Sequence, residues 1–266
     1  MCIVALVADR SPLNARSVVL STLLGTDPPR MHVRRLLRVT DLFGLPQGNV
    51  RTALTRMTQR GDLTTDGNGS YALARHLVER QIRQRQSRGA EQVAWSGRWS
   101  LLVVTAESRS PDVRAELRRA MGLLRFAEQR EGVWLRPDNL PHDRQPEAHG
   151  AVDRQCDRYL AHPAMDDAQL AATLWDLEAW AASAGELRRE MAALVIRLEA
   201  GDTAALAPGF VASADVLRLF QADPLLPDEL HDRHWPGRRL RADYDRYDRA
   251  YRDLLWHWLA ESGPRH

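Results

Sequence analysis

The chain has 266 residues, enough for two or three domains that each bury a core, and only two cysteines, which excludes a disulfide framework. The apolar stretch from Cys2 to Ala8 is too short for a secretion signal or a membrane span, so we expect a cytoplasmic protein with no membrane partner. Residues 1–90 carry a net charge of +8 (14 arginines, six acidic residues) and residues 91–266 a net charge of −6 (23 arginines, 29 acidic residues), a distribution typical of a polyanion-binding module on a separate body.

Apolar side chains that recur every three to four positions predict three helices near the start of the chain. The first is predicted to start at Ser11-Pro12, an N-cap followed by proline, and to end at Gly25. The second follows the linker 26–30 and turns three arginines outward: Arg34, Arg35 and Arg38. The third follows a short turn at 44–47, ends at Gly61 and places four residues inward: Val50, Ala53, Leu54 and Met57.

A hairpin follows the third helix. Residues 63–65 and 70–73 read as strands, and Asp66-Gly67-Asn68-Gly69 supplies the residues that a tight turn needs. Two helices joined by a short turn and followed by a hairpin form a helix-turn-helix with a wing, and a linking helix is predicted at 74–88, with Leu77, Val78 and Ile82 inward. We expect DNA contacts from the outward residues of the third helix and from the second helix: Asn49, Arg51, Thr52, Thr55, Arg56, Arg34 and Arg35. A solvated polar helix face is the alternative.

The middle of the chain predicts a β-α-β-β unit. An apolar run at 99–105 indicates a buried strand, and Ser110-Pro111 caps a helix that ends at Gly122. Residues 124–129 and 133–136 are predicted to pair as strands, and 139–150 to form a loop. Residues 151–160 are charged and look more helical than extended, so their fold stays open.

The remaining residues predict helices from Asp167 onward, the last one starting near Leu240. Aromatic residues at helical spacing are typical of a core, and an effector pocket with apolar walls and cationic anchors is the alternative. The candidate effector residues are Arg98, Arg125, Trp134 and Trp175.

Several segments resemble the PaaX-type repressors of phenylacetate-degradation operons. In the first third these are ARSVVL at 15–20, FGL at 43–45, VRTALTRM at 50–57 and GDL at 61–63. WSGRW at 95–99, GVWLRP at 132–137, DPLLPDEL at 223–230 and WPG at 235–237 resemble the later signatures of the family. The resemblance spans residues 12–250 in order.

This resemblance implies an α+β protein with a winged helix-turn-helix at 11–88, a ferredoxin-like dimerisation domain at 95–165 that residues 151–160 would complete, and a helical C-terminal domain at 166–266. It implies a homodimeric repressor that binds palindromic double-stranded DNA and is released by a small acidic or acyl-CoA-type effector, with no catalytic residues, metal or cofactor. The family's wing usually carries arginines, whereas Asp66 gives this one a negative charge.

Two other classes stay open. No glycine-rich phosphate loop, nucleophile elbow or His-Glu-x-x-His motif occurs, but histidines at 142, 149, 231 and 234 have acidic neighbours and could serve acid–base chemistry or a metal. The same scaffold would then bind or transform a small metabolite with DNA binding weakened or lost. The other class is a dimeric interaction protein that does not bind DNA.

Overall fold

The computed structural model describes residues 13–89 and 91–261, without the side chains of 80 and 83–88. Its described residues fall into two compact units, each built from separate stretches of chain. One contains the residues up to 88 together with 184–218 and those from 239 onward; the other contains 89–183 and 219–238. The predicted boundaries of three domains, at 11–88, 95–165 and 166–266, stay a prediction.

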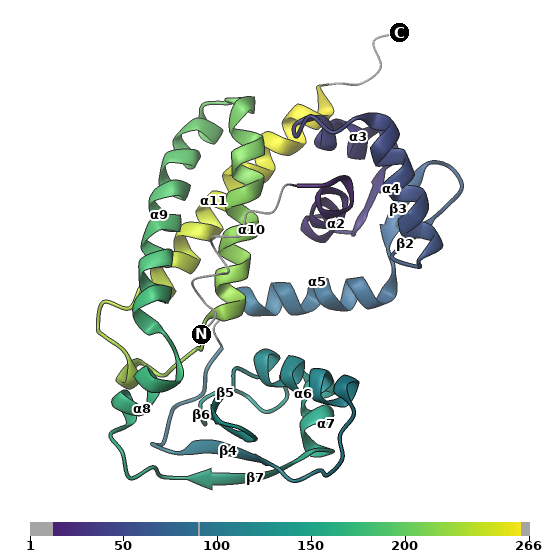
Figure 1. Cartoon of the computed structure of the whole chain (residues 1–266). Helices are drawn as coiled ribbons and strands as arrows, with labels where there is room; N and C mark the ends of the chain where they lie inside the picture. The colour runs from purple at the N-terminus through teal and green to yellow at the C-terminus, as the bar shows by residue number, and fades with distance from the viewer. Residues whose placement is uncertain (1–12, 90, 262–266) are drawn as a thin grey trace. The chain divides into compact units, whose positions relative to one another are not determined.

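The first unit begins with a winged helix-turn-helix (Figure 1). Its helices are α2 (Ala15–Gly25), α3 (Val33–Asp41), α4 (Gln47–Gln59) and α5 (Arg75–Arg88), and its strands are β1 (Arg30–His32), β2 (Leu63–Thr65) and β3 (Ser70–Leu73). The strands form an antiparallel sheet in the order β1-β3-β2. Val19, Leu36, Val50, Leu54 and Leu63 are all at most 2 % exposed, so the four helices and the hairpin share one core.

Two sequence predictions change within this unit, and one strand was not predicted. The residues Ser11 and Pro12 lie outside the described chain, and α2 is capped instead by Asn14, whose side chain accepts from the backbone N–H of Ser17 while the Ser17 hydroxyl accepts from that of Asn14. The strand β1 was not predicted, because three residues are too few to show alternation. Ile82 points outward, with 49 % of its surface exposed, and Gln81 takes the inward place, donating to the backbone oxygens of Leu24 and Thr26.

Parts of three long helices complete the first unit: α9 (Leu177–Glu199), α10 (Leu206–Ala222) and α11 (Gly237–Ala260), with the short helix η1 (Thr203–Ala205) before α10. The tyrosines Tyr244, Tyr247 and Tyr251 of α11 are buried, as the aromatic spacing predicted. The segment Thr203–Ala222 is long and apolar enough to cross a membrane, but core helices of soluble proteins pass the same test, so one such helix is weak evidence.

The second unit is built on a four-stranded antiparallel sheet (Figure 1). Its elements are β4 (Trp99–Val104), α6 (Pro111–Leu123), β5 (Ala127–Arg130), β6 (Val133–Pro137), α7 (Pro146–Asp153), β7 (Cys156–Ala161), α8 (Asp167–Leu174) and η2 (Asp228–Leu230). The order β5-β6-β4-β7 and the β-α-β-β-α-β sequence make it ferredoxin-like.

Residues 151–160 complete this unit with the end of α7 and most of β7. The helical appearance of this segment therefore holds for its first residues and is wrong for those from Cys156 onward, which form a strand. The strand β7 is an edge strand in which only Cys156 is buried, and it therefore lacks an alternating apolar pattern. Residues 139–150 are a loop only up to the start of α7 at Pro146.

Candidate nucleic-acid interface and effector site

The helix α4 presents its polar side outward. Its inward residues Val50, Leu54 and Met57 are at most 1 % exposed, and the helical period therefore turns the five predicted DNA-contacting residues to solvent. All five are exposed: Asn49, Arg51, Thr52, Thr55 and Arg56. The turn before α4 includes Gly44, whose φ of 64° favours glycine, and it closes through hydrogen bonds from the N–H groups of Gly44 and Leu45 to the carbonyls of Asp41 and Thr40.

The polar groups of α4 differ in how much of their bonding capacity is used within the helix. The hydroxyls of Thr52 and Thr55 donate to the backbone oxygens of Gly48 and Arg51, at 2.9 and 3.1 Å. No carboxylate among residues 13–89 and 91–261 forms an ion pair with Arg51 or Arg56. These two guanidinium groups are thus available to an external anion or base edge.

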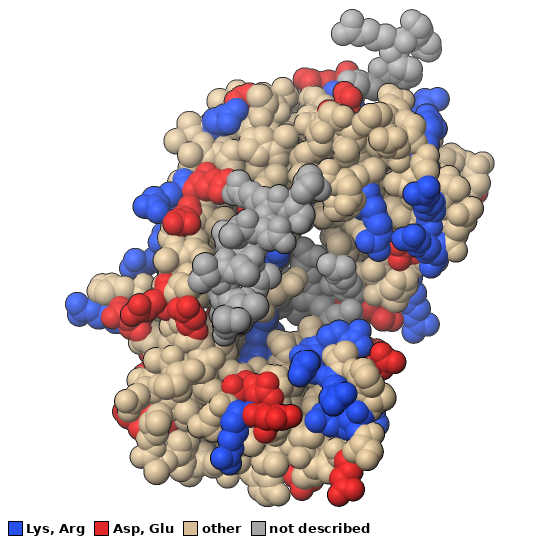
Figure 2. All heavy atoms as spheres, viewed as in Figure 1, with Lys and Arg blue, Asp and Glu red and all other residues tan. Residues whose placement is uncertain are grey.

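The arginines of α3 have separate surroundings. Arg34 and Arg35 are both exposed, and Arg35 also lies over the ring of Trp256, with its guanidinium carbon 5.8 Å from the ring centroid. Arg38, predicted to face outward, is half-buried and lies 4.0 Å from the ring centroid of Trp258. Both tryptophans belong to α11, so cation–π contacts attach α3 to the C-terminal helix within the first unit. Figure 2 shows basic side chains along the side of this unit where α4 lies.

In the second unit, the four predicted effector residues do not meet in one pocket. Trp134 packs with Leu102 in the core between the sheet and the helices α6 and α7. Trp175 stacks on Trp99, with the ring centroids 6.4 Å apart, in a cluster on the opposite face of the sheet. Arg125 donates to the backbone oxygen of Phe220.

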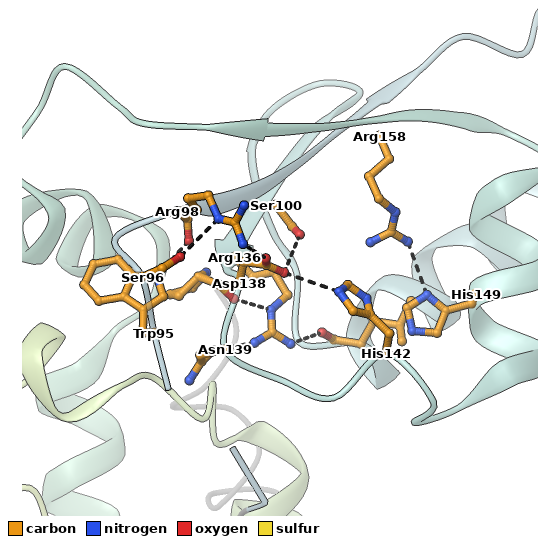
Figure 3. Close-up of polar contacts among 12 residues, drawn as sticks. Trp95, Ser96, Arg98, Ser100, Arg136, Asp138, Asn139, His142, His149 and Arg158 are labelled. Atoms are coloured by element: carbon orange, nitrogen blue, oxygen red, sulfur yellow. Dashed lines mark hydrogen bonds and ion pairs between the residues drawn. The ribbon is translucent and has the colours of Figure 1, made fainter. Parts of the chain in front are cut away.

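The fourth residue, Arg98, belongs to a polar cluster at the start of β4 and the end of β6 (Figure 3). Its guanidinium donates to Ser96 and lies 3.9 Å from the carboxylate of Asp138. Asp138 also accepts from Ser100 and lies 3.8 Å from His142. The cluster surrounds the buried Arg136, which the sequence reasoning did not single out.

The histidines considered for chemistry are engaged in local contacts. His231 stacks on Trp235, with the ring centroids 5.2 Å apart, and His234 accepts from Arg233. His149 lies 3.2 Å from a guanidinium nitrogen of Arg158. Within the described chain no group of three or more His, Cys, Asp or Glu residues could hold a metal ion.

A winged helix-turn-helix whose α4 carries arginines that no carboxylate of the described residues pairs is typical of DNA-binding proteins of the transcriptional-regulator class. Three family models then match the chain in order: the PaaX-like protein at 14–77, the PaaX protein central Cas2-like domain at 92–155 and the PaaX-like protein C-terminal domain at 175–260. The chain belongs to the PaaX family, whose members regulate transcription.

Among solved structures, the chain is similar to the uncharacterized protein Rv0674 from Mycobacterium tuberculosis. The two are 37 % identical with a TM-score of 0.70, and the similarity covers 92 % of this chain and 98 % of that one. The comparison with curated proteins gives no match.

Proposed function

We propose that the protein is a cytoplasmic transcriptional repressor that binds palindromic operator DNA as a homodimer and leaves it when a small acidic or acyl-CoA-type effector binds. The observation that carries the proposal is the exposed side of α4, which presents Arg51 and Arg56 to solvent. No carboxylate of the described residues forms an ion pair with either arginine. Arginine takes the edge of guanine through two hydrogen bonds in the major groove, and each such pair contributes about 1–3 kcal/mol of discrimination.

The other exposed residues of this surface fit complementary roles. Asn49 suits the edge of adenine, and the methyl groups of Thr52 and Thr55 suit a thymine methyl because their hydroxyls donate to the helix itself. Arg34 suits a phosphate, since it is exposed beside α4 on α3. Arg35 is also exposed, so it can lie over Trp256 in the α3–α11 contact and still offer hydrogen-bond donors to a phosphate.

Dimerisation through the sheet of the second unit is supported by the edge strand β7. Two large apolar side chains on this strand, Tyr159 and Leu160, are 51 % and 53 % exposed. An edge strand of this kind offers unpaired backbone groups to a second copy of the chain. A twofold dimer would present two α4 helices to two half-sites.

The test is an electrophoretic mobility shift with a duplex that contains the palindrome upstream of the protein's own gene. We expect a shift at moderate salt that Arg51→Ala with Arg56→Ala abolishes without a change in thermal stability. The matched control is Arg239→Ala with Arg249→Ala, which removes the same charge from exposed positions on α11. Absence of a shift at low salt, or an equal loss in both double variants, contradicts the proposal.

A further inference from the structure

The helix-covered side of the ferredoxin-like sheet contains a small hollow at the end where β4 begins and β6 ends (Figure 3). Its volume is about 30 Å³, room for roughly two water molecules. Apolar side chains, among them Leu123, Leu140 and Pro141, form part of its wall. The rest of the wall is rich in cationic and imidazole groups: Arg136, Arg144, Arg158, His142 and His149.

The floor of this hollow is a buried cation. Arg136 is 6 % exposed, and its guanidinium donates to the carbonyls of Pro137 and Leu124 and to the side-chain oxygen of Asn139, at 2.8, 3.0 and 2.6 Å. These acceptors are neutral, so they satisfy three of the N–H donors without neutralising the charge. The pKa of Arg136 is lowered to about 9, mainly by burial and also by the charges of the nearby Arg144 and Arg158, against the opposing effect of Asp138, and the group remains protonated at neutral pH.

The rim adds further positive charge. Arg158 reaches from β7 to His149 on α7, at 3.2 Å, and lies 3.9 Å from Asp153. Arg144 comes from the loop before α7 and donates to the backbone oxygen of Glu91. Asp138, a carboxylate in the wall of the hollow, is shared among Arg98, His142 and Ser100. Three arginines, Arg136, Arg144 and Arg158, therefore line one small space.

We propose that this hollow binds the oxyanion head group of a small acidic metabolite, a carboxylate or a phosphate, with Arg144 and Arg158 as its charged ligands. The hollow admits oxygen atoms of the head group and leaves the remainder of the ligand outside, next to Leu123, which is 45 % exposed. That this ligand is also the effector rests on the proposed function. The anion site itself does not.

Binding at this site is linked to the protonation of His149. Burial is the largest cause that lowers the pKa of His149, and the charge of Arg158 is the next. Asp153 raises this pKa, whereas His142 and Arg136 lower it. A bound anion favours the imidazolium form, so it raises this pKa, and by linkage the anion binds more tightly as the pH falls through it. Acetate, a carboxylate that stays charged above about pH 6 whereas phosphate titrates near neutral pH, separates the effect in that range from titration of the ligand.

The experiment titrates the full-length protein with inorganic phosphate and, separately, with acetate, against sodium chloride at equal ionic strength, and follows the pKa of His149 by the NMR signal of its ring. His149→Gln assigns the signal. We expect saturable binding that raises the pKa of His149. The affinity should fall about tenfold or more in Arg158→Gln and in Arg144→Gln. Arg154→Gln is the control, because it removes the same charge next to the site without lining the hollow.

The two ligand arms separate the sources: saturation by acetate alone indicates a carboxylate ligand, and saturation by phosphate alone a phosphate ligand. A response equal to that of chloride, or binding unchanged in both Arg158→Gln and Arg144→Gln, overturns the inference. Since no DNA is present, either outcome leaves the result of the mobility shift untouched, and the two proposals fail separately.

Discussion

At the tip of the wing, the carboxylate of Asp66 accepts hydrogen bonds from the backbone N–H groups of Asn68 and Ser70, at 2.9 and 3.0 Å, and pairs with Arg30. Those two backbone bonds, followed by Arg30, lower the pKa of Asp66, so the group is charged throughout the physiological range. The acidic wing thus has a local explanation, since Asp66 folds the turn and compensates an arginine of β1.

Removing this charge should make the wing more attractive to DNA. The amide of Asp66→Asn can still accept in the turn, but Arg30 becomes free to meet a phosphate. We expect tighter binding to a duplex of unrelated sequence, with the dependence of affinity on salt steeper by up to about one counterion. Fluorescence anisotropy at several salt concentrations measures both quantities. Glu178→Gln, the same charge change on an exposed residue of α9, is the control, and an equal effect of both substitutions rules out a role of the wing.

The residues of the two candidate sites differ in how far the sequence could find them. The outward side of α4 follows from the helical period, because Val50, Leu54 and Met57 fix which side is buried. The contact of Arg38 with Trp258 joins residues 220 positions apart and has no local signal. The hollow around Arg136 likewise gathers side chains from separate segments, so periodicity could not show it.

Where α10 meets α11, one glycine sets the distance between the helices. A Cβ added to Gly209 would lie 2.9 Å from the ring of Tyr251 and 3.0 Å from the hydroxyl of Tyr247, which itself donates to the carbonyl of Gly209. Burial raises the pKa of both tyrosines well above its usual range. This crossing therefore couples the stability of the first unit to alkaline pH.

The sign of that coupling follows from proton counting. Tyrosine in an unfolded chain ionises at about pH 10. Above this pH the unfolded state therefore binds fewer protons than the folded state. We expect the urea midpoint to fall as the pH rises above about 10, and to fall less steeply in Tyr251→Phe. The control is Tyr159→Phe, at an exposed position of the other unit. An equal slope in wild type and Tyr251→Phe would show that this ring does not carry the coupling.

Elements with strong local signals were predictable, and elements defined by their neighbours were not. The hairpin strands 63–65 and 70–73 were predicted with the observed bounds, because the glycines between them are typical of a tight turn. In the structure Gly67 and Gly69 have φ of 78° and 85° in this turn. The strand β1 exists because Arg30–His32 pairs with β3, and β7 because it pairs with β4. Neither shows alternation of its own.

For the whole molecule, the proposed mode of operator binding requires two copies. We expect light scattering at micromolar concentration to give twice the chain mass of 30.1 kDa, because the edge of β7 is exposed and apolar. Tyr159→Arg with Leu160→Arg should shift the protein to monomer, as like charges on the two copies would repel. Ile196→Arg, at a position 71 % exposed on α9, is the control. A wild-type monomer would contradict dimerisation, and a dimer insensitive to the β7 pair would place the interface elsewhere.

The central claim is that the outward side of α4 reads base sequence. The most direct measurement is the ratio of affinities for the upstream palindrome and for a scrambled duplex of equal length and composition, in wild type and in Arg51→Ala with Arg56→Ala, at one salt concentration. We predict a clear preference for the palindrome in wild type that falls to about one in the double variant, since base contacts specify whereas phosphate contacts only position. A wild-type ratio of about one, or a preference that survives the loss of both arginines, would contradict the account.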